Sequence, residues 1–310
     1  MDKKIINDIK KLCGDDKVFE NVKLSEYTSF KTGGPADCLV RPVTIDELKK
    51  VTDYVRKNNI PYYVIGNGTN MLAADEGFRG VIIALKDMSG EISFSDTQDD
   101  DTVAVTAYAG CTLARLSAEA ASKGLAGTEF ASGIPGSIGG AVVMNAGAYG
   151  GEIKDILEYA DVLDESGNIL RLKNEDLGFG YRKSIIQEKN YIVLMVSFLL
   201  KRGDEKTIKA EMRELNERRR EKQPLEYPSA GSTFKRPEGL FAGKLIEDSG
   251  LKGYRVGDAQ VSEKHCGFVV NRGKATSSDI YKLIGDVIGI VYEKTGVQLD
   301  PEIKLLGFDE

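Results

Sequence analysis

The spacing of hydrophobic and polar positions predicts a chain that mixes amphipathic helices with buried strands. Apolar residues recur every three to four positions in several segments, which is the period of a helix with one buried face. Helices are predicted at residues 1–14, 44–59, 112–123, 205–222, 242–249 and 279–295. Short apolar runs between turn residues predict strands instead. These runs lie at residues 62–65, 81–85, 103–108, 156–164, 169–172, 191–200 and 267–270.

Polar residues with defined local roles mark where several of these elements begin and end. Thr44 with Glu47, and Thr276 with Asp279, have the spacing of capping boxes at helix N-termini. Residues 165–168 read Glu-Ser-Gly-Asn, a turn that would join the strands on either side into a hairpin. The pattern therefore predicts a β-rich first two thirds and an α+β last third, divided near residue 203.

Glycine is abundant and unevenly distributed. The chain has 34 glycines among 310 residues, and nine of them fall within residues 124–151, which follow neither the helical nor the strand period. A shorter block, Gly66–Asn70, follows a predicted strand, and its backbone N–H groups could surround a phosphate. A tight turn is the alternative for this block, and Met71 stands where a Rossmann fingerprint needs glycine. Together the two blocks favour a dinucleotide cofactor outside the Rossmann class, bound against bare backbone.

Composition excludes several kinds of chemistry. The net charge of −6 argues against broad nucleic-acid binding, which needs a basic face. The single histidine, His265, excludes multi-histidine metal sites, and the four cysteines are too far apart in sequence for a zinc or disulfide framework. The basic run 218–222 is a solvated helix face or, alternatively, a local anion site. The N-terminus does not have the pattern of a signal peptide, and no apolar run is long enough to span a membrane, so we expect a cytoplasmic protein.

Six motifs in a fixed order give a specific resemblance. They are TSFKTGGPA at 28–36, GNGTN at 66–70, SGIPGSIGGAVVMNAGAYGGE at 132–152, GYRKS at 180–184, GSTFKRP at 231–237 and DPEIK at 300–304. This ordered set, which covers about residues 22 to 307, closely resembles the UDP-N-acetylenolpyruvoylglucosamine reductase (MurB) family of bacterial peptidoglycan precursor synthesis. No long insertion separates Arg182 from Tyr191, as in the family's shorter subtype, which lacks a substrate-covering tyrosine loop.

The resemblance implies an α+β fold with a two-lobed FAD-binding region of the vanillyl-alcohol-oxidase (PCMH) type, followed by a C-terminal α+β substrate-binding domain. The expected boundaries are 1–88 for the first FAD-binding lobe, 89–203 for the second lobe and 204–310 for the UDP-sugar domain. FAD would be held noncovalently, with His265 a structural residue, and NADPH would be the co-substrate. The implied reaction reduces an enolpyruvyl ether to a lactyl ether, with hydride passing from NADPH to FAD and then from flavin N5 to the substrate β-carbon.

Three residues match the family's catalytic positions. Ser232, in GSTFK, matches the donor of a proton to the α-carbon; without the motif it would be a turn serine. Arg182, in GYRKS, matches the arginine that binds the substrate carboxylate in a fork; otherwise it is an ordinary surface arginine. Glu302, in DPEIK, matches a glutamate that orients the intermediate or relays a proton; otherwise it is a surface acid at the start of a strand.

The remaining candidates are expected to bind the two ligands. The predicted cofactor-binding residues are Gly66, Asn67, Gly68, Thr69, Asn70, Gly136, Ser137, Gly140 and Gly147. The predicted substrate-binding cations are Lys222, Arg236 and Lys304, because the substrate carries a diphosphate. No metal is expected. The predicted partners are limited to the UDP-sugar, with a monomer, no nucleic acid and no membrane.

Two other functions stay open at this point. One is an FAD-linked oxidase of a small alcohol or hydroxy acid with the same flavin-binding fold, against which the three catalytic motifs argue. The other is a non-catalytic module that binds flavin or a UDP-sugar. Turnover of NADPH in the presence of the enolpyruvyl UDP-sugar separates all three functions.

Overall fold

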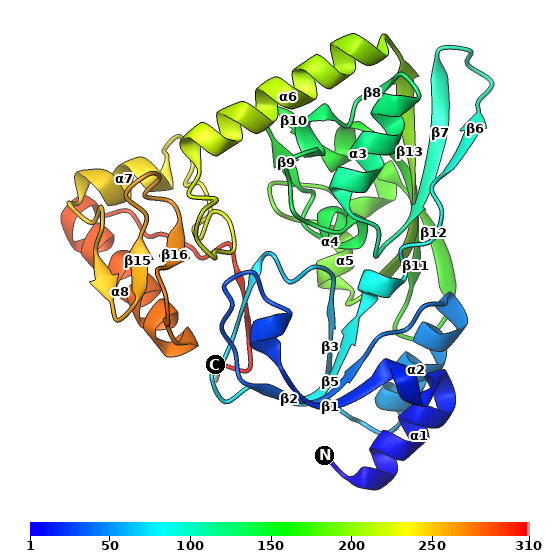
Figure 1. The fold of residues 1–310 in the computed structure, drawn as a ribbon, viewed down its shortest axis with the longest axis horizontal. Coiled ribbons are helices and arrows are strands. Elements are labelled where there is room, and N and C mark those ends of the chain that lie inside the picture. Colours follow the sequence, from blue (N-terminus) through cyan, green and yellow to red (C-terminus); the bar gives the residue numbers. More distant parts are fainter. Residues whose placement is uncertain (309–310) are drawn as a thin grey trace. The chain divides into compact units, whose positions relative to one another are not determined.

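The chain forms two compact units. The computed structural model describes residues 1–308, and Figure 1 shows their helices and strands in chain order. The first unit contains residues 1–19, 38–67 and 80–219, and the second contains residues 20–37, 68–79 and the chain from Arg220 onward. Each unit has its own cluster of buried hydrophobic side chains.

The larger sheet of the first unit is antiparallel, with strand order β12-β11-β13-β7-β6 and with β8 paired to β13 (Figure 1). Its strands are β6 (Ser93–Asp96), β7 (Thr102–Tyr108), β8 (Leu125–Ala126), β11 (Leu157–Leu163), β12 (Ile169–Lys173) and β13 (Ile192–Arg202). The long apolar run predicted as a strand becomes β13, which lies between β11 and β7 and is buried along most of its length. The predicted hairpin is confirmed, since Leu163 of β11 pairs with Ile169 of β12.

A second sheet has the order β1-β2-β5-β3. Its strands are β1 (Val18–Lys23), β2 (Pro35–Val40), β3 (Tyr62–Ile65) and β5 (Phe78–Ala84). β3 and β5 are parallel, with Tyr62 opposite Val81, and the chain passes between the two units within β1, β2 and β5. The helices α1 (Lys3–Cys13) and α2 (Ile45–Lys57) pack against each other in the first unit.

Four further helices belong mainly to the first unit. They are α3 (Leu113–Ser122), α4 (Ile138–Val143), α5 (Ile185–Glu188) and α6 (Glu205–Lys222). α4 packs against β13 and β7, which puts this short helix on the larger sheet. It is followed by the two-residue strands β9 (Gly147–Ala148) and β10 (Gly151–Glu152), which pair with each other.

The second unit is a small α+β structure. Its antiparallel sheet consists of β14 (Arg255–Val256), β15 (Ala259–Val261) and β16 (Val269–Asn271), and its helices are α7 (Ala242–Asp248) and α8 (Ser277–Thr295). α8 packs on this sheet (Figure 1). Another pair of strands, β4 (Met71–Ala73) and β17 (Lys304–Leu306), is parallel and joins chain segments more than 200 residues apart.

The structure confirms the six predicted helices to within a few residues and corrects two details. The capping box predicted at Thr276 is complete. The one predicted at Thr44 is only half formed: the Thr44 hydroxyl caps α2, but the Glu47 carboxylate accepts from the amide of Val43. The block 124–151, which has no overall period, contains α4.

The two compact units do not coincide with the three predicted ranges, 1–88, 89–203 and 204–310, because residues 20–37 and 68–79 group with the C-terminal part of the chain. The assignment of those ranges to two FAD-binding lobes and a substrate domain stays a prediction. Within residues 1–308, no helix has the length and apolar character that crossing a membrane requires.

Candidate functional site

The two glycine blocks meet in the first unit. A Cβ atom added to Gly66 would lie 2.1 Å from the hydroxyl oxygen of Ser137, far inside van der Waals contact. The side-chain amide of Asn67 donates to the carbonyl of Pro135 at 3.2 Å. Ser137 is the N-cap of α4, and its hydroxyl accepts from the amide of Gly140 at 3.3 Å. The structure therefore brings together four of the predicted cofactor-binding residues.

Two glycine positions of the second block, Gly136 and Gly140, could carry a side chain without a steric clash. The nearest atom to a Cβ placed on Gly136 would be 3.8 Å away, and a Cβ on exposed Gly140 would have only the Ser137 hydroxyl within 4 Å, at 3.4 Å. By contrast, a Cβ on Gly139 would be 2.9 Å from Ala109 Cβ, so packing within the protein already requires that glycine. At Gly136 and Gly140 the protein itself leaves room for a side chain, as expected where a flat or extended group lies against the backbone.

Gly147 is different from these two positions. Its Cβ would come within 2.8 Å of both the Glu152 side chain and the carbonyl of Gly151, so the pairing of β9 with β10 accounts for this glycine. Its role in cofactor binding stays a prediction.

The rest of the first glycine block belongs to the second unit. Gly68 has a φ of +62°, a Cβ there would lie 1.8 Å from the carbonyl oxygen of Tyr27, and its own carbonyl accepts from the amide of Ser29 at 3.0 Å. Asn70 is bound to the DPEIK motif, since its side-chain amide donates to the carbonyl of Glu302 at 3.3 Å. Thr69, between them, is partly exposed. This block thus ends beside a predicted catalytic residue.

Ser232 and Glu302 lie on adjacent extended segments of the second unit. Ser232 forms an antiparallel bridge with Phe268 on one side. On the other side, the amide of Glu302 donates to the carbonyl of Thr233 at 2.8 Å. Ser232 is partly exposed and Glu302 is 9% exposed. The structure therefore brings the predicted proton donor and the predicted glutamate into neighbouring segments.

The predicted substrate-binding cations have different surroundings. The pKa of Lys304 is lowered, chiefly because its amino group is partly desolvated and further because Lys235 carries the same charge, while Glu302 acts in the opposite direction. Its neighbours thus include a predicted catalytic residue. Lys222 is the exposed last residue of α6. The guanidinium of Arg236 lies 3.9 Å from the centre of the Phe241 ring.

Arg182 belongs to the first unit, in a tight turn. The bridge between Gly180 and Lys183 closes this turn, and Arg182 has a φ of +54° in it. The hydroxyl of Ser184 donates to the carbonyl of Val143, the last residue of α4, at 2.7 Å. The turn is therefore attached to the second glycine block, although the two motifs are separate in sequence.

Asn145 is not among the residues predicted from the sequence, yet it also connects these two motifs. Its side-chain amide donates to the carbonyl of Gly180 at 3.2 Å and to the carboxylate of Glu152 at 2.8 Å. Asn145 has a φ of +41° and is 1% exposed. An asparagine among glycines indicates a left-handed backbone position, and that was the only available signal in the sequence.

His265 lies in the second unit with partners of its own. Its Nδ1 atom accepts from the amide of Gly267 at 3.1 Å, and its ring meets the edge of Phe268 with centroids 5.0 Å apart. Burial lowers the pKa of its imidazole below the usual value. These contacts are those of a neutral, packed histidine.

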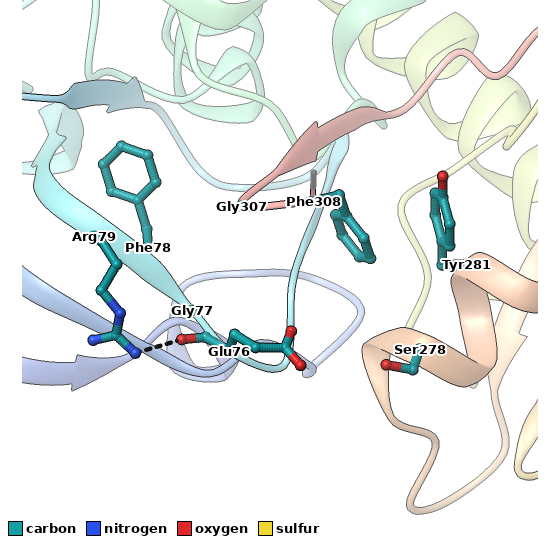
Figure 2. Close-up of a pocket in the computed structure, with 8 residues that line it drawn as sticks. All are labelled: Glu76, Gly77, Phe78, Arg79, Ser278, Tyr281, Gly307 and Phe308. Atoms are coloured by element: carbon teal, nitrogen blue, oxygen red, sulfur yellow. Dashed lines mark hydrogen bonds between the residues drawn. The ribbon is translucent and has the colours of Figure 1, made fainter. Parts of the chain in front are cut away.

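A pocket of about 650 Å³ lies in the second unit, apart from the predicted site residues. Figure 2 shows Tyr281 and Phe308 on one side of it, and their rings stack with centroids 4.7 Å apart. Figure 2 also shows Arg79, whose guanidinium donates to the carbonyl of Glu76 at 2.8 Å. The lining residues are Glu76, Gly77, Phe78, Arg79, Ser278, Tyr281, Gly307 and Phe308.

Comparison with known proteins covers nearly the entire chain. Residues 36–173 match the family model "FAD binding domain", and residues 223–306 match "UDP-N-acetylenolpyruvoylglucosamine reductase, C-terminal domain". A UDP-N-acetylenolpyruvoylglucosamine reductase of Lachnoclostridium phytofermentans is 51% identical over 99% of this chain and 98% of its own length. The chain belongs to the UDP-N-acetylenolpyruvoylglucosamine reductase family. A second family member, from Caldanaerobacter subterraneus subsp. tengcongensis, is 50% identical over 98% of both chains.

A solved structure of this reductase family gives the same result for the fold. The crystal structure of UDP-N-acetylenolpyruvylglucosamine reductase (MurB) from Thermus caldophilus matches with a TM-score of 0.77 and 38% identity, over 92% of this chain and 97% of that chain. The resemblance found in the ordered motifs is thereby confirmed, and so are the predicted fold class, the oxidoreductase activity and FAD as the cofactor. Membership of the shorter subtype stays a prediction.

Proposed function

We propose that this reductase converts the enolpyruvyl ether of UDP-N-acetylglucosamine into UDP-N-acetylmuramate at the expense of NADPH. The observation that carries this proposal is the 51% identity, over 99% of the chain, to a protein named for that reductase activity. The FAD-binding model over residues 36–173 supports a flavin-dependent route.

FAD, when bound, supplies hydride transfer between NADPH and the enolpyruvyl group. The residues of this chain that would hold it are the predicted nine, Gly66, Asn67, Gly68, Thr69, Asn70, Gly136, Ser137, Gly140 and Gly147. The contact between Gly66 and Ser137, together with the lack of any close contact at Gly136 and Gly140, supports this assignment. The donors in this region are hydroxyl, amide and backbone groups, which suit a nucleotide cofactor.

In the proposed reaction, the chain supplies one proton and stabilises negative charge. Hydride addition at the β-carbon of the double bond leaves an enolate-like charge on the α-carbon and its carboxylate. The Arg182 guanidinium would bind that carboxylate through two parallel hydrogen bonds. Ser232 would then give its hydroxyl proton to the α-carbon, for which an enolic carbanion is a strong enough base. Glu302 would orient the intermediate or return a proton to Ser232.

Three cations are proposed to bind the charged part of the substrate, namely Lys222, Arg236 and Lys304. A diphosphate needs cationic or amide donors, and all three residues belong to the second unit. Lys304 has the strongest support, because its charge interacts with that of Glu302.

The same proposal places the enzyme in the cytoplasm, as a monomer that binds no nucleic acid. Its nucleotide-linked substrate and its net charge of −6 support this. Size-exclusion chromatography with light scattering tests the oligomeric state, and a second copy in the particle would contradict it.

NADPH oxidation, followed with and without the enolpyruvyl UDP-sugar in the absence of oxygen, tests the reaction. We expect yellow protein that NADPH bleaches, and sustained turnover only when the UDP-sugar is present, with formation of UDP-N-acetylmuramate. Oxygen-dependent oxidation of a small alcohol or hydroxy acid, without any response to the UDP-sugar, would establish the oxidase alternative instead. Bleaching of the flavin by NADPH without turnover of the UDP-sugar would indicate that the protein is a non-catalytic binding module.

A further inference from the structure

The backbone at Arg182 is in a conformation that needs support from its surroundings. Its φ of +54° lies in the left-handed region, where the backbone of a residue with a side chain is strained. Such strain persists only where neighbouring groups fix the backbone. The groups that do so here are the side chains of Gln187, which lies in α5 just after the turn, and of Asn145, which lies just after α4.

Gln187 bonds to the turn and to the helix at once. Its side-chain nitrogen donates to the carbonyl of Arg182 at 3.2 Å and to the carbonyl of Val143 at 2.7 Å. Val143 is the last residue of α4. One amide group therefore connects the backbone of the predicted catalytic arginine to the C-terminal end of this helix.

Asn145 makes a second, buried connection. Its Nδ2 atom donates to the carbonyl of Gly180 and to the carboxylate of Glu152, and its Oδ1 atom accepts from the amide of Lys154 at 3.0 Å. Both ends of the amide are thus used, and the left-handed φ of Asn145 suits an asparagine. This connection holds the other side of the Arg182 turn.

The same short helix also begins at the cofactor site. Ser137, at its N-cap, contacts Gly66 and accepts from Gly140. Six helical residues span about 9 Å, so α4 acts as a spacer of fixed length between Ser137 and the Arg182 turn. A displacement of the turn at the end of α4 would shift the guanidinium relative to the proposed flavin site.

We propose that Asn145 and Gln187 are positioning residues that fix the Arg182 turn at the end of α4, at the distance from the cofactor site that substrate reduction requires. This inference rests on the proposed function, because it assigns Arg182 to the substrate carboxylate. It predicts a selective defect. Reduction of the flavin by NADPH does not need Arg182, whereas reoxidation by the enolpyruvyl substrate does.

Two variants of the FAD-loaded enzyme test this. Asn145→Gly keeps a residue that accepts positive φ and removes the side-chain amide, and Gln187→Met keeps the side-chain length and removes the donor. The matched control is Asn190→Gly, an exposed asparagine with a φ of +48° whose amide donates to Glu165 at 3.3 Å. FAD content and thermal midpoint are measured first. Stopped-flow absorbance then follows reduction by NADPH and reoxidation by substrate, and calorimetry gives the dissociation constant of UDP-N-acetylmuramate.

We expect reoxidation to slow by roughly 10- to 100-fold in both variants, as for a displacement of about 1 Å in a reacting group, with weaker binding of UDP-N-acetylmuramate. Reduction by NADPH, FAD content and the control should match the wild type. Unchanged reoxidation and binding in the variants would overturn the inference, and so would an equal loss in both half-reactions. If Asn145→Gly does not fold, Gln187→Met decides alone. A wild-type enzyme that the substrate does not reoxidise would instead overturn the proposed function.

Discussion

Ser232 combines a partly exposed side chain with a backbone held on both sides. Its bridge to Phe268 and the hydrogen bond from Glu302 to the next residue leave this segment little freedom to move. A hydroxyl in such a place can be aimed at one carbon atom of a bound substrate, which is what proton donation requires.

Ser232→Ala should therefore separate the two half-reactions. We expect NADPH to bleach the flavin at the wild-type rate and reoxidation by the enolpyruvyl substrate to fall by roughly 10²–10⁴-fold, because the positioned proton donor is lost. Rapid-mixing absorbance measures both steps. Ser229→Ala, three residues earlier in the same loop, is the control and should behave as wild type. Normal half-reactions in Ser232→Ala would show that another group donates the proton.

Because the chain has a single histidine, one substitution removes the whole contribution of histidine to the pH dependence of its stability. Burial lowers the pKa of His265 in the folded state below the usual 6.5. Between pH 6.5 and the lower pKa of the folded state, His265 is protonated in the unfolded chain but neutral in the folded chain. The free energy of unfolding therefore falls as the pH falls through this range, and it levels off below the folded pKa. We expect His265→Gln to have a flatter free energy of unfolding between about pH 7.5 and pH 5.5, measured with urea. An identical slope in both proteins would mean that His265 titrates normally.

Sequence reasoning at the scale of single residues is confirmed at Thr276, where a capping motif fixes the local conformation. It did not find Asn145 and Gln187, because the proposed role of each comes from a hydrogen bond to another part of the fold. Asn145 bonds to Gly180, 35 residues away, and Gln187 bonds to Arg182, 5 residues away. No local sequence pattern predicts the shape of the turn that these bonds hold. For Gly147 the sequence could indicate that glycine is needed at this position. It could not predict the β9–β10 pairing, which leaves no room for a Cβ atom there.

Among the elements, α4 connects the glycine blocks with the Arg182 turn despite its poor helix-forming sequence. Gly139 and Gly140 disfavour a helix by about 1 kcal/mol each relative to alanine. A Cβ on Gly139 would collide with Ala109, whereas a Cβ on Gly140 would make only an ordinary contact with the Ser137 hydroxyl, at 3.4 Å. A methyl group added at Gly140 should therefore interfere with cofactor binding without disturbing the folded protein.

Gly140→Ala should preserve the apoprotein and weaken FAD binding. The apoprotein should be as stable as wild type or about 1 kcal/mol more stable, because alanine favours the helix. The added methyl group occupies the space proposed for the cofactor, so we expect loss of bound FAD, measured by the ratio of flavin to protein absorbance. Gly285→Ala in α8, where nothing lies within 4 Å of the new Cβ, is the control for a helix glycine outside the site. Full FAD occupancy in Gly140→Ala would remove Gly140 from the cofactor site.

The first turn of α8 is held by a residue from a distant segment. The carboxylate of Asp75 accepts from the amides of Ser277 and Ser278, both at 2.8 Å, and from the Ser278 hydroxyl at 2.7 Å. Desolvation alone would raise the pKa of Asp75, but these hydrogen bonds outweigh it and lower the pKa below the usual 3.8. The stabilisation is therefore present above that pH and is lost as the pH falls through the folded pKa.

Asp75→Asn should lower the free energy of unfolding by about 1.5–3 kcal/mol at neutral pH, since charged hydrogen bonds to the helix N-terminus are weakened. The difference from wild type should shrink as the solution is acidified toward pH 4 and below. Denaturant unfolding at several pH values measures both effects. Asp248→Asn, which breaks an exposed ion pair with Lys244, should cost much less, because solvent screens that pair. A constant difference at every pH would assign the loss to packing instead of charge.

The elements that sequence reasoning found are those with a long period or a clear cap, such as α8 with its complete capping box at Thr276. Most of the elements it missed are short, although the six-residue strands β1 and β2 were missed as well. Strands of two or three residues, such as β9 and β4, contain too few positions for an alternating pattern, and they are fixed by pairing with partners elsewhere in the chain. α4 was missed because tertiary contacts with β13 and β7 override the low helix propensity of its glycines.

At the scale of the whole molecule, the order of segments along the chain differs from the order in which they pack. The buried hydrophobic cluster of the second unit is built mainly from residues beyond 229, yet it contains Phe30 and Leu72, both 0% exposed. Asn271 also donates to the carbonyl of Phe30 at 3.1 Å. Composition and motif order gave no reason to expect this packing of distant segments.

This arrangement makes a strong prediction about residues 204–310 expressed alone. The fragment lacks Phe30 and Leu72 from its hydrophobic cluster, β4 as the partner of β17, and the Asp75 carboxylate at α8. Removing one large buried side chain costs about 2–5 kcal/mol, and a domain of this size has about 5–15 kcal/mol in total. We therefore expect the fragment to show no cooperative unfolding transition, as followed by circular dichroism during thermal and urea denaturation.

The full-length variant Leu72→Ala is the matched comparison for this experiment. It removes one of the missing contributions while keeping the chain intact, and we expect it to lose about 2–5 kcal/mol of stability and still fold. A fragment that unfolds cooperatively at the midpoint of the whole chain would contradict this account. It would mean that residues 204–310 are an autonomous substrate-binding domain, and that the segments around Phe30 and Leu72 merely lie on its surface.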